Sequence, residues 1–237
     1  MKHTSILPLV LLVSFSGCVV RVTESEAPPN RLRPAEVSAG WKLLFDGETT
    51  RGWRGYRKDT MPAGWEVVDG ALTRTGSGGD VITLEQFASF ELALEWKISE
   101  GGNSGIFFHG TEARNAVYET APEYQVLDNS VHRDGGDPRT SAGANYALHA
   151  PAADYTRPAG EWNEARISVH GDHVTHWLNG QRILEYELGS EAWKKLVAES
   201  KFAAWPEYGT AGSGHIALQD HGDEVAYRNI KILPLTE

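Results

Sequence analysis

Cysteine and clusters of basic residues are what this chain most clearly lacks. Only one cysteine, Cys18, occurs in 237 residues, so no disulfide can form within the chain and the fold must be held by its core. The 32 acidic residues outnumber the 22 basic ones, which gives a formal charge of −10. No Lys/Arg cluster alternates with aromatic residues, so a nucleic acid is not an expected partner.

The sequence also lacks the glycine and cysteine patterns of several well-known sites. It contains no Gly-x-x-x-x-Gly-Lys phosphate loop, no Gly-x-Ser-x-Gly elbow and no paired-cysteine zinc site. The glycine clusters at residues 76–79 and 101–102 precede strand patterns rather than helices and therefore indicate turns. We expect neither a nucleotide nor a flavin cofactor.

No apolar run is long enough to span a membrane, but residues 1–17 have the basic start, apolar stretch and small-residue end of an export signal. Cys18 follows the expected cleavage point and resembles the lipidated cysteine of a bacterial lipoprotein. Val19, where a retention signal has aspartate, would then direct the protein to the outer membrane. We expect residues 18–39 to form a lipid-anchored tether and residues 40–237 to form the folded domain. A plain secretory signal that happens to contain a cysteine is the alternative.

The domain has the pattern of an all-β protein. Phe90–Ile98 alternates large apolar residues with charged or small ones, which predicts a strand with one buried face. Asp69-Gly70 and Asn179-Gly180 each separate two strand-like segments and predict hairpin turns. Further strands are expected at residues 105–109, 123–127, 164–170, 214–220 and 225–233. About ten strands with turns between them favour a β-sandwich, and only residues 190–200 have helical spacing.

Two of these strands carry polar residues on a single face. Side chains alternate along a strand, so Glu123 and Gln125 share one face, and Gln219 and His221 share one face of theirs. Such residues could bind the hydroxyl groups of a carbohydrate, and Glu123 could act as a general base. The simpler interpretation is that this face is the hydrated side of an antiparallel sheet.

The loop after Glu123 could hold a metal ion. Asp128, His132 and Asp134 offer the oxygen and nitrogen donors that a divalent cation uses, and a cation would offset the repulsion between the carboxylates. Their spacing matches no standard metal signature. Local turn hydrogen bonds and an exposed histidine would explain the same residues.

Several motifs together resemble the 3-keto-disaccharide hydrolase domain family. They run in order from about residue 40 to 233 and read "GWKLLFDGETTRGWRGY", "GWEVVDGALTR", "FELALEWKISEGGNSGIFFHG", "EYQVLDN", "GEWNEARISVHGDHVTHWLNG" and "IALQDHGDEVAYRNIKI". The resemblance implies a concanavalin A-like jelly-roll sandwich that cleaves 3-keto-glycosides made by a partner sugar 3-dehydrogenase. It implies catalytic roles for Glu123, Asp128, His221 and Arg228, and substrate contacts from Asn103, Ser104, Gln125 and Gln219. At two further substrate-contacting positions the chain departs from the family: His109 replaces an arginine, and Tyr146 lies in "NYAL" where relatives have "LYDL".

The implied chemistry is an elimination. A ketone at C3 acidifies the hydrogen on C2, and the glycosidic oxygen on C1 can then leave without the oxocarbenium ion of ordinary glycosidases. Such a site needs a base (Glu123 or His221), a positive group at the enolate oxygen (Arg228 or a divalent cation) and an acid or metal ligand (His132 or Asp128). A non-catalytic carbohydrate-binding module, a classical glycosidase with Asp128 or Asp220 as its second carboxylate, and a structural lipoprotein are the alternatives.

Overall fold

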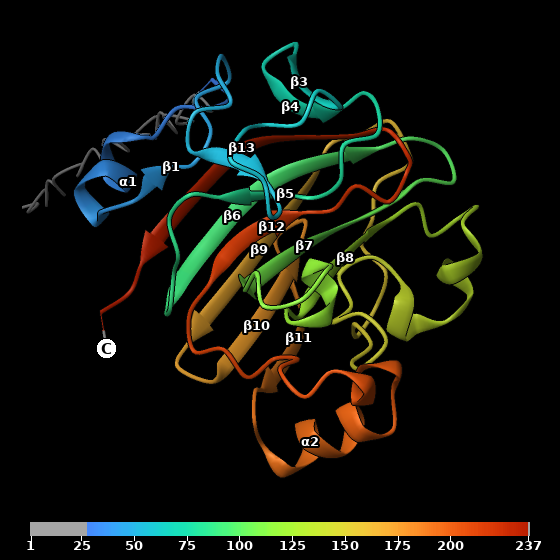
Figure 1. Cartoon of the computed structure of the whole chain (residues 1–237). Helices are drawn as coiled ribbons and strands as arrows, with labels where there is room; N and C mark the ends of the chain where they lie inside the picture. Colours follow the sequence, from blue (N-terminus) through green and yellow to red (C-terminus); the bar gives the residue numbers. More distant parts are fainter. Residues whose placement is uncertain (1–27, 237) are drawn as a thin grey trace, which may run out of the picture.

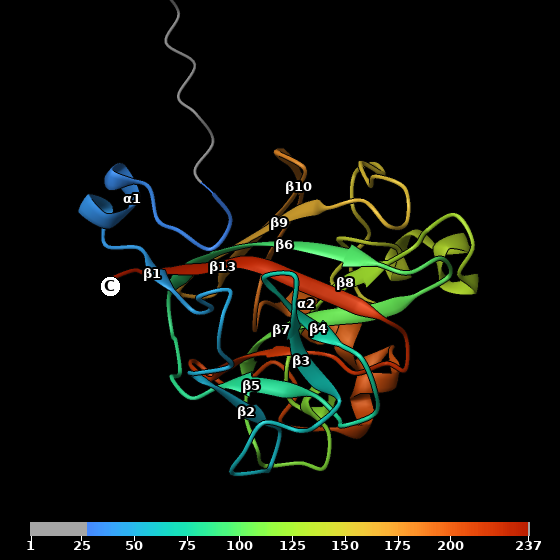
Figure 2. The same ribbon diagram turned by 90° about the horizontal axis from the view of Figure 1, so that it is seen from above.

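The structure, a computed structural model, describes residues 28–236. The predicted signal and Cys18 lie outside the described residues. Two antiparallel sheets pack face to face, which confirms the predicted all-β jelly-roll sandwich (Figure 1). Figure 2 separates β6 and β13 of one layer from β5 and β7 of the other.

The larger sheet has eight strands and the smaller has five. The eight-stranded sheet has the order β11-β10-β9-β6-β13-β4-β3, with β1 paired to β13. Its strands are β1 (Lys42–Leu43), β3 (Trp65–Val68), β4 (Ala71–Arg74), β6 (Phe90–Ile98), β9 (Asn163–His170), β10 (His173–Leu178), β11 (Gln181–Glu187) and β13 (Val225–Pro234). The five-stranded sheet has the order β2-β5-β12-β7-β8 and is built from β2 (Trp53–Gly55), β5 (Val81–Thr83), β12 (His215–Leu218), β7 (Asn103–Gly110) and β8 (Glu123–Leu127).

Both predicted hairpin turns are confirmed. Asp69 and Gly70 have φ values of 50° and 75°, and Asn179 and Gly180 have 49° and 78°. Positive φ at both central residues matches the right-handed twist of the flanking strands. These turns fix the registers of β3 with β4 and of β10 with β11.

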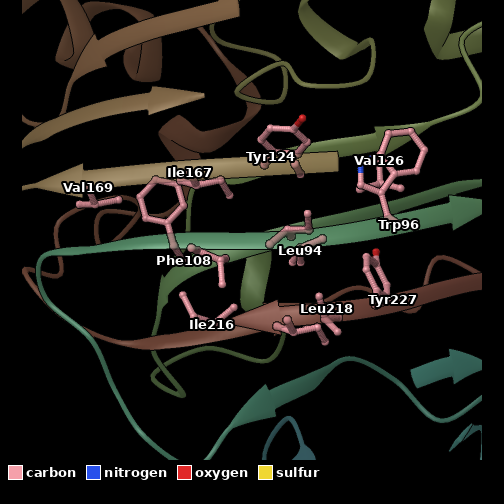
Figure 3. Packing of buried hydrophobic residues seen from close by; sticks show 14 of the residues in the cluster. Leu94, Trp96, Phe108, Tyr124, Val126, Ile167, Val169, Ile216, Leu218 and Tyr227 are labelled. Carbon is pink, nitrogen blue, oxygen red and sulfur yellow. The ribbon is translucent and has the colours of Figure 1, made fainter. Parts of the chain in front are cut away.

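The core fills the space between the sheets. Figure 3 shows apolar side chains of both sheets meeting there, among them Leu94, Trp96 and Ile167 from one layer and Phe108, Tyr124 and Leu218 from the other. Because strand residues alternate, the neighbours of these residues on the five-stranded sheet must point to its outer face. A smaller apolar cluster, which includes Ile82, Phe107 and Ala217, covers part of that outer face.

Helical segments are more numerous than predicted. They are α1 (Pro34–Ala39), α2 (Glu191–Ala198) and the 3-10 turns η1 (Val117–Glu119), η2 (Arg133–Gly136), η3 (Pro138–Thr140) and η4 (Lys201–Ala204). The predicted helix corresponds to α2, which Ser190 caps by accepting a hydrogen bond from Trp193 N. None of the helices described has the length and apolar character needed to cross a membrane.

The expected tether is shorter than predicted at its C-terminal end. Asn30 exchanges hydrogen bonds with Asn229 and donates one to Gly70 O at 2.8 Å. Glu36 of α1 forms an ion pair with Lys231 of β13. Residues 30–39 therefore dock on the eight-stranded sheet and belong to the folded unit.

Candidate active site

The outer face of the five-stranded sheet has a hollow where β12, β7 and β8 run side by side. Gly105 of β7 is in register with Gln125 of β8, and Gln219 N donates to Gly105 O at 3.0 Å from the other side. Residues opposite one another on adjacent strands share a face. Two glutamine side chains therefore stand on either side of a residue that has none.

Glu123 fills the edge of this hollow. A Cβ placed on Gly105 would meet Glu123 Oε1 at 2.2 Å, so the carboxylate lies directly against the glycine backbone. Glu123 is only 5% exposed. Within residues 28–236 its carboxylate has no hydrogen-bond or ion-pair partner, which is unusual for a buried acid.

A cavity of about 120 Å³ opens beside this carboxylate, and we call it the Glu123 cavity. Its walls come from segments far apart in the sequence: β7, β8, the residues after β12, η1, η4 and the loop that contains residue 146. The lining residues are Asn103, Tyr118, Glu123, Gln125, Tyr146, Lys201, Gln219 and His221. The structure therefore brings Glu123 and the 219–221 segment to one hollow, as the sequence predicted.

Two amide oxygens in this cavity are buried without a partner. Oε1 of Gln125 and Oε1 of Gln219 accept no hydrogen bond from the residues described. Gln125 Nε2 donates to Thr140 O at 3.2 Å, which holds the amide in one orientation. Because an unmade buried hydrogen bond costs about 1–3 kcal/mol, each of these oxygens would be stabilised by a hydroxyl group that reached it.

Lys201 supplies the positive charge of the cavity. Its ammonium lies 4.4 Å from the ring centroid of Tyr146 and 5.7 Å from that of Tyr118. Although part of the lysine is exposed to solvent, desolvation lowers the pKa of its ammonium, while the charges of Glu123 and Asp134 oppose that shift. Tyr146 links this group to the neighbouring loop, since its hydroxyl donates to Asp134 Oδ2 at 3.5 Å.

Burial raises the pKa of Glu123 to about 8. Lys201 lowers the pKa of this carboxyl, and the charges of Asp80 and Asp134 raise it further. Burial also raises the pKa of Asp80 to about 6, against a hydrogen bond from Asp220 N. Perturbed carboxyl groups at a cavity are typical of a catalytic site.

Two of the predicted substrate-binding residues, Ser104 and His109, lie away from the Glu123 cavity. Ser104 points into the core, where it donates to Gln219 O and contacts the Tyr227 hydroxyl, both at 2.8 Å, because it alternates with Asn103. His109 is buried at the far end of β7, with Nε2 2.7 Å from Ala88 O. Neither side chain reaches the Glu123 cavity, so the predicted substrate contacts of Ser104 and His109 are wrong for this site.

Arg228 is on the opposite sheet. It is on β13, where it forms an ion pair with Glu95 at 2.7 Å and stacks at 4.1 Å over Trp162. Its neighbour Tyr227 points into the core, so Arg228 points to the outer face of the eight-stranded sheet. The prediction that it stabilises an enolate beside Glu123 is therefore wrong.

The acidic loop has mainly structural contacts. Asp128 accepts hydrogen bonds from Gly101 N at 2.8 Å and from the Ser130 hydroxyl at 2.6 Å. Burial alone would raise the pKa of Asp128, but these hydrogen bonds outweigh burial and lower it. His132 Nδ1 accepts a hydrogen bond from Asp134 N at 3.1 Å, and neither Asp128 nor His132 lines the cavity.

The predicted metal site does not fit the structure. In the described part of the chain, no group of three or more His, Cys, Asp or Glu side chains is arranged to hold a metal ion. The carboxylate of Asp128 is instead engaged by Gly101 N and the Ser130 hydroxyl. The prediction that Asp128, His132 and Asp134 together bind a metal ion is therefore wrong.

Sequence reasoning missed Lys201, Tyr118 and Asp80. Lys201 and Tyr118 belong to short 3-10 turns, which have no periodic pattern, and only the tertiary fold brings them to β8. Asp80 directly precedes β5, the strand paired with β12. This pairing cannot be predicted from one sequence, so no sequence signal placed Asp80 near the site.

Known proteins are similar to this chain in sequence and in fold. The profile of the 3-keto-alpha-glucoside-1,2-lyase-like domain matches residues 40–233. A 3-keto-disaccharide hydrolase of Bacteroides thetaiotaomicron is 39% identical over 225 residues, which cover 81% of this chain and 78% of that protein.

Two crystal structures from Parabacteroides distasonis, each described as that of a "putative glycosyl hydrolase", are also similar. One has a TM-score of 0.83 at 33% identity and covers 88% of this chain and all of its own. The other has a TM-score of 0.65 at 28% identity and covers 82% of this chain and 99% of its own. The chain therefore belongs to the 3-keto-alpha-glucoside-1,2-lyase-like domain family and is a glycoside-cleaving enzyme that acts on carbohydrate.

Proposed function

We propose that this protein cleaves 3-keto-glycosides by elimination across C1 and C2, with Glu123 as the base. The observation that carries the proposal is a buried carboxylate, with no partner among residues 28–236, at the wall of a small polar cavity. Burial strengthens the basicity of Glu123, because its pKa is raised to about 8. A strong, desolvated base suits removal of a carbon-bound proton.

The remaining roles fall to residues of the same cavity. Removal of the C2 proton by Glu123 places negative charge on the C3 oxygen, and Lys201 is the positively charged side chain among the lining residues described. His221, at the exposed rim, can donate a proton to the departing C1 oxygen. Gln125 and Gln219 would accept hydrogen bonds from the sugar hydroxyls.

The elimination forms an enone with a C1–C2 double bond and releases the aglycone. Addition of water to that double bond completes net hydrolysis, whereas release of the unsaturated sugar makes the enzyme a lyase. The substrate ketone must come from a sugar 3-dehydrogenase, which we propose as the functional partner. The sequence features of residues 1–19 support an outer-membrane lipoprotein anchored through Cys18, facing the periplasm or the cell surface.

Two alternatives are less well supported. A classical glycosidase needs a second carboxylate about 5–9.5 Å from the first, and both predicted candidates are engaged elsewhere. Asp128 accepts hydrogen bonds from Gly101 N and the Ser130 hydroxyl. Asp220 forms an ion pair with Arg74 at 2.5 Å and accepts hydrogen bonds from Gly78 N and Gly79 N. A binding module would not need the raised basicity of Glu123.

The test uses purified protein with 3-keto-trehalose and with trehalose. We expect cleavage of the keto sugar alone, and loss of about 10²–10³ in rate for Glu123→Gln. EDTA added to a parallel reaction tests whether a divalent cation takes part. Cleavage of trehalose itself, or unchanged turnover of the keto sugar by Glu123→Gln, would contradict the proposal.

A further inference from the structure

The proposed mechanism leaves one partly buried carboxyl group near the Glu123 cavity unused, that of Asp80. Asp80 directly precedes β5 and is not among the residues that line the cavity. Among residues 28–236, its carboxylate accepts one hydrogen bond, from Asp220 N at 2.9 Å. Asp220 lies between Gln219 and His221, which both line the cavity. Asp80 therefore contacts the wall of the site from behind.

The pairing of β5 with β12 places Asp80 on the same face of the sheet as the site. Ile82 is opposite Ala217, and both belong to the apolar cluster on the outer face of the five-stranded sheet. Two residues farther along, the same register puts Asp80 opposite Gln219, and residues two apart on a strand share a face. Gln219 in turn neighbours Gly105 on β7. One residue therefore separates Asp80 from the glycine over which the catalytic carboxylate leans.

Other contacts hold the segment after β12 from two sides. Toward β7, Gln219 N donates to Gly105 O at 3.0 Å. Toward β4, the carboxylate of Asp220 forms an ion pair with Arg74. The peptide N–H between these two anchored residues donates to Asp80. Asp80 thus fixes the orientation of this peptide, and with it the directions in which the flanking side chains leave the backbone.

The negative charge of Asp80 also acts on Glu123. Burial is the main cause of the raised pKa of Glu123, and the charge of Asp80 raises that pKa further. Because the pKa of Asp80 is about 6, Asp80 is ionised while Glu123 loses its proton. Asp220 also faces Asp80 and raises its pKa. Tyr56 and Tyr227, which this charge also affects, keep their protons over the same range because burial raises both pKa values.

We propose that Asp80 is a positioning residue of the site, which holds the segment of residues 219–221 against the cavity and strengthens Glu123 as a base through its negative charge. This inference rests on the proposed function, because it assumes that Glu123 removes the C2 proton. Asp80 acts through these neighbours and needs no contact with the substrate.

Two substitutions separate the two effects. Asp80→Asn removes the charge but keeps an acceptor for Asp220 N, because its amide oxygen can take the place of the carboxylate oxygen. Asp80→Ala removes both. Asp59→Asn, which removes one negative charge at an exposed position, is the matched control. Each protein is assayed with 3-keto-trehalose over a range of pH. The pKa of Glu123 is measured separately by NMR of ¹³C-labelled carboxyl groups, with Glu123→Gln to assign the signal.

In Asp80→Asn, the pKa of Glu123 and the rising limb of kcat/KM should both move down by about 0.5–1 unit, because a negative neighbour is lost. KM should stay near the wild-type value. In Asp80→Ala, the same shift should come with a rise in KM of about 10-fold, and the amide hydrogen of Asp220 should exchange faster. Asp59→Asn should behave like wild type.

An unchanged pKa of Glu123 in Asp80→Asn would refute the electrostatic role, and a wild-type KM in Asp80→Ala would refute the positioning role. The NMR titration needs no turnover and no alanine variant, so it decides the first role even if Asp80→Ala fails to fold. If wild type cleaves no 3-keto-glycoside, the proposed function fails instead, and the titration still shows whether Asp80 acts on Glu123.

Discussion

At the scale of single residues, the protein keeps a carboxylate where folding disfavours its charged form. Burial raises the pKa of Glu123 to about 8, and Lys201 limits the increase. A carboxyl group of this kind holds its proton more tightly in the folded state than in the unfolded state. The free energy of unfolding should therefore fall as pH rises from the usual glutamate pKa toward 8.

The variant Glu123→Gln tests whether ionisation of the buried carboxyl lowers the free energy of unfolding. Gln cannot ionise, so the variant should be more stable than wild type at pH 8, and the difference should shrink toward pH 4.5. One pKa unit corresponds to about 1.4 kcal/mol, and about 2–4 °C in Tm accompanies each kcal/mol for a domain of this size. Thermal unfolding at several pH values measures it. Equal Tm differences at pH 4.5 and pH 8 would mean that folding does not raise the pKa of Glu123.

Lys201→Met tests the electrostatic pairing of the two groups. Loss of the ammonium should move the pKa of Glu123 above about 8, because Lys201 lowers it in the wild-type protein. In wild type, kcat/KM should rise with pH as Glu123 loses its proton, and should fall again below the usual lysine range as Lys201 loses its own. The variant should shift the rising limb upward and change the falling limb, because Lys201 no longer contributes to it. Unchanged limbs would place the titrating groups elsewhere.

At the scale of secondary-structure elements, the site depends on how β7 and β8 pair. Gly105 is opposite Gln125, and two residues along, on the same face, Phe107 is opposite Glu123. The side chain of Glu123 therefore leans over the position that has no Cβ. This arrangement needs glycine for space rather than for backbone conformation.

Gly105→Ala should move Glu123 while leaving the core unchanged. The new methyl group would lie 2.2 Å from Oε1 and 2.8 Å from Cδ of Glu123, so the carboxylate must shift by an ångström or more. A shift of that size costs about 10²-fold in rate. Steady-state kinetics measures the loss, and Gly136→Ala, where a Cβ meets nothing within 4 Å, is the matched control. Equal activities of the two variants would show that the position of Glu123 is not critical.

Sequence patterns predicted the elements that carry one buried face. The alternation in Phe90–Ile98 gives β6 with the same bounds, and the Asp-Gly and Asn-Gly turns are where they were expected. The same alternation could have excluded Ser104, because it must face away from Asn103. The 3-10 turns that supply Tyr118 and Lys201 were missed, since they follow no period and depend on tertiary packing for their position.

At the scale of the whole molecule, the charged residues of the candidate site lie at one sheet, and a structural ion pair lies on the other. The Arg228–Glu95 pair belongs to the outer face of the eight-stranded sheet, while Lys201 of η4 and Glu123 of β8 line the cavity at the other sheet. The family resemblance identified Arg228 as a site residue, but no sequence pattern states which sheet a strand will join. The position of β13 between β6 and β4 settles that question.

Arg228→Gln should therefore leave kcat/KM unchanged. The variant loses a partly exposed ion pair and the stacking on Trp162, which together contribute about 0.5–2 kcal/mol to stability. Chemical denaturation and steady-state kinetics on the same sample separate the two effects. A loss in kcat/KM of about 10²-fold or more, with stability preserved, would show that Arg228 takes part in catalysis.

The most direct test of the central claim is exchange of the C2 hydrogen of the substrate. Wild-type enzyme in D₂O should incorporate deuterium at C2 of a 3-keto-glycoside or show a primary isotope effect with C2-deuterated substrate, and Glu123→Gln should do neither at a comparable rate. Cleavage with no isotope effect at C2 and no exchange, or exchange that persists in Glu123→Gln, would contradict the account of Glu123 as the base.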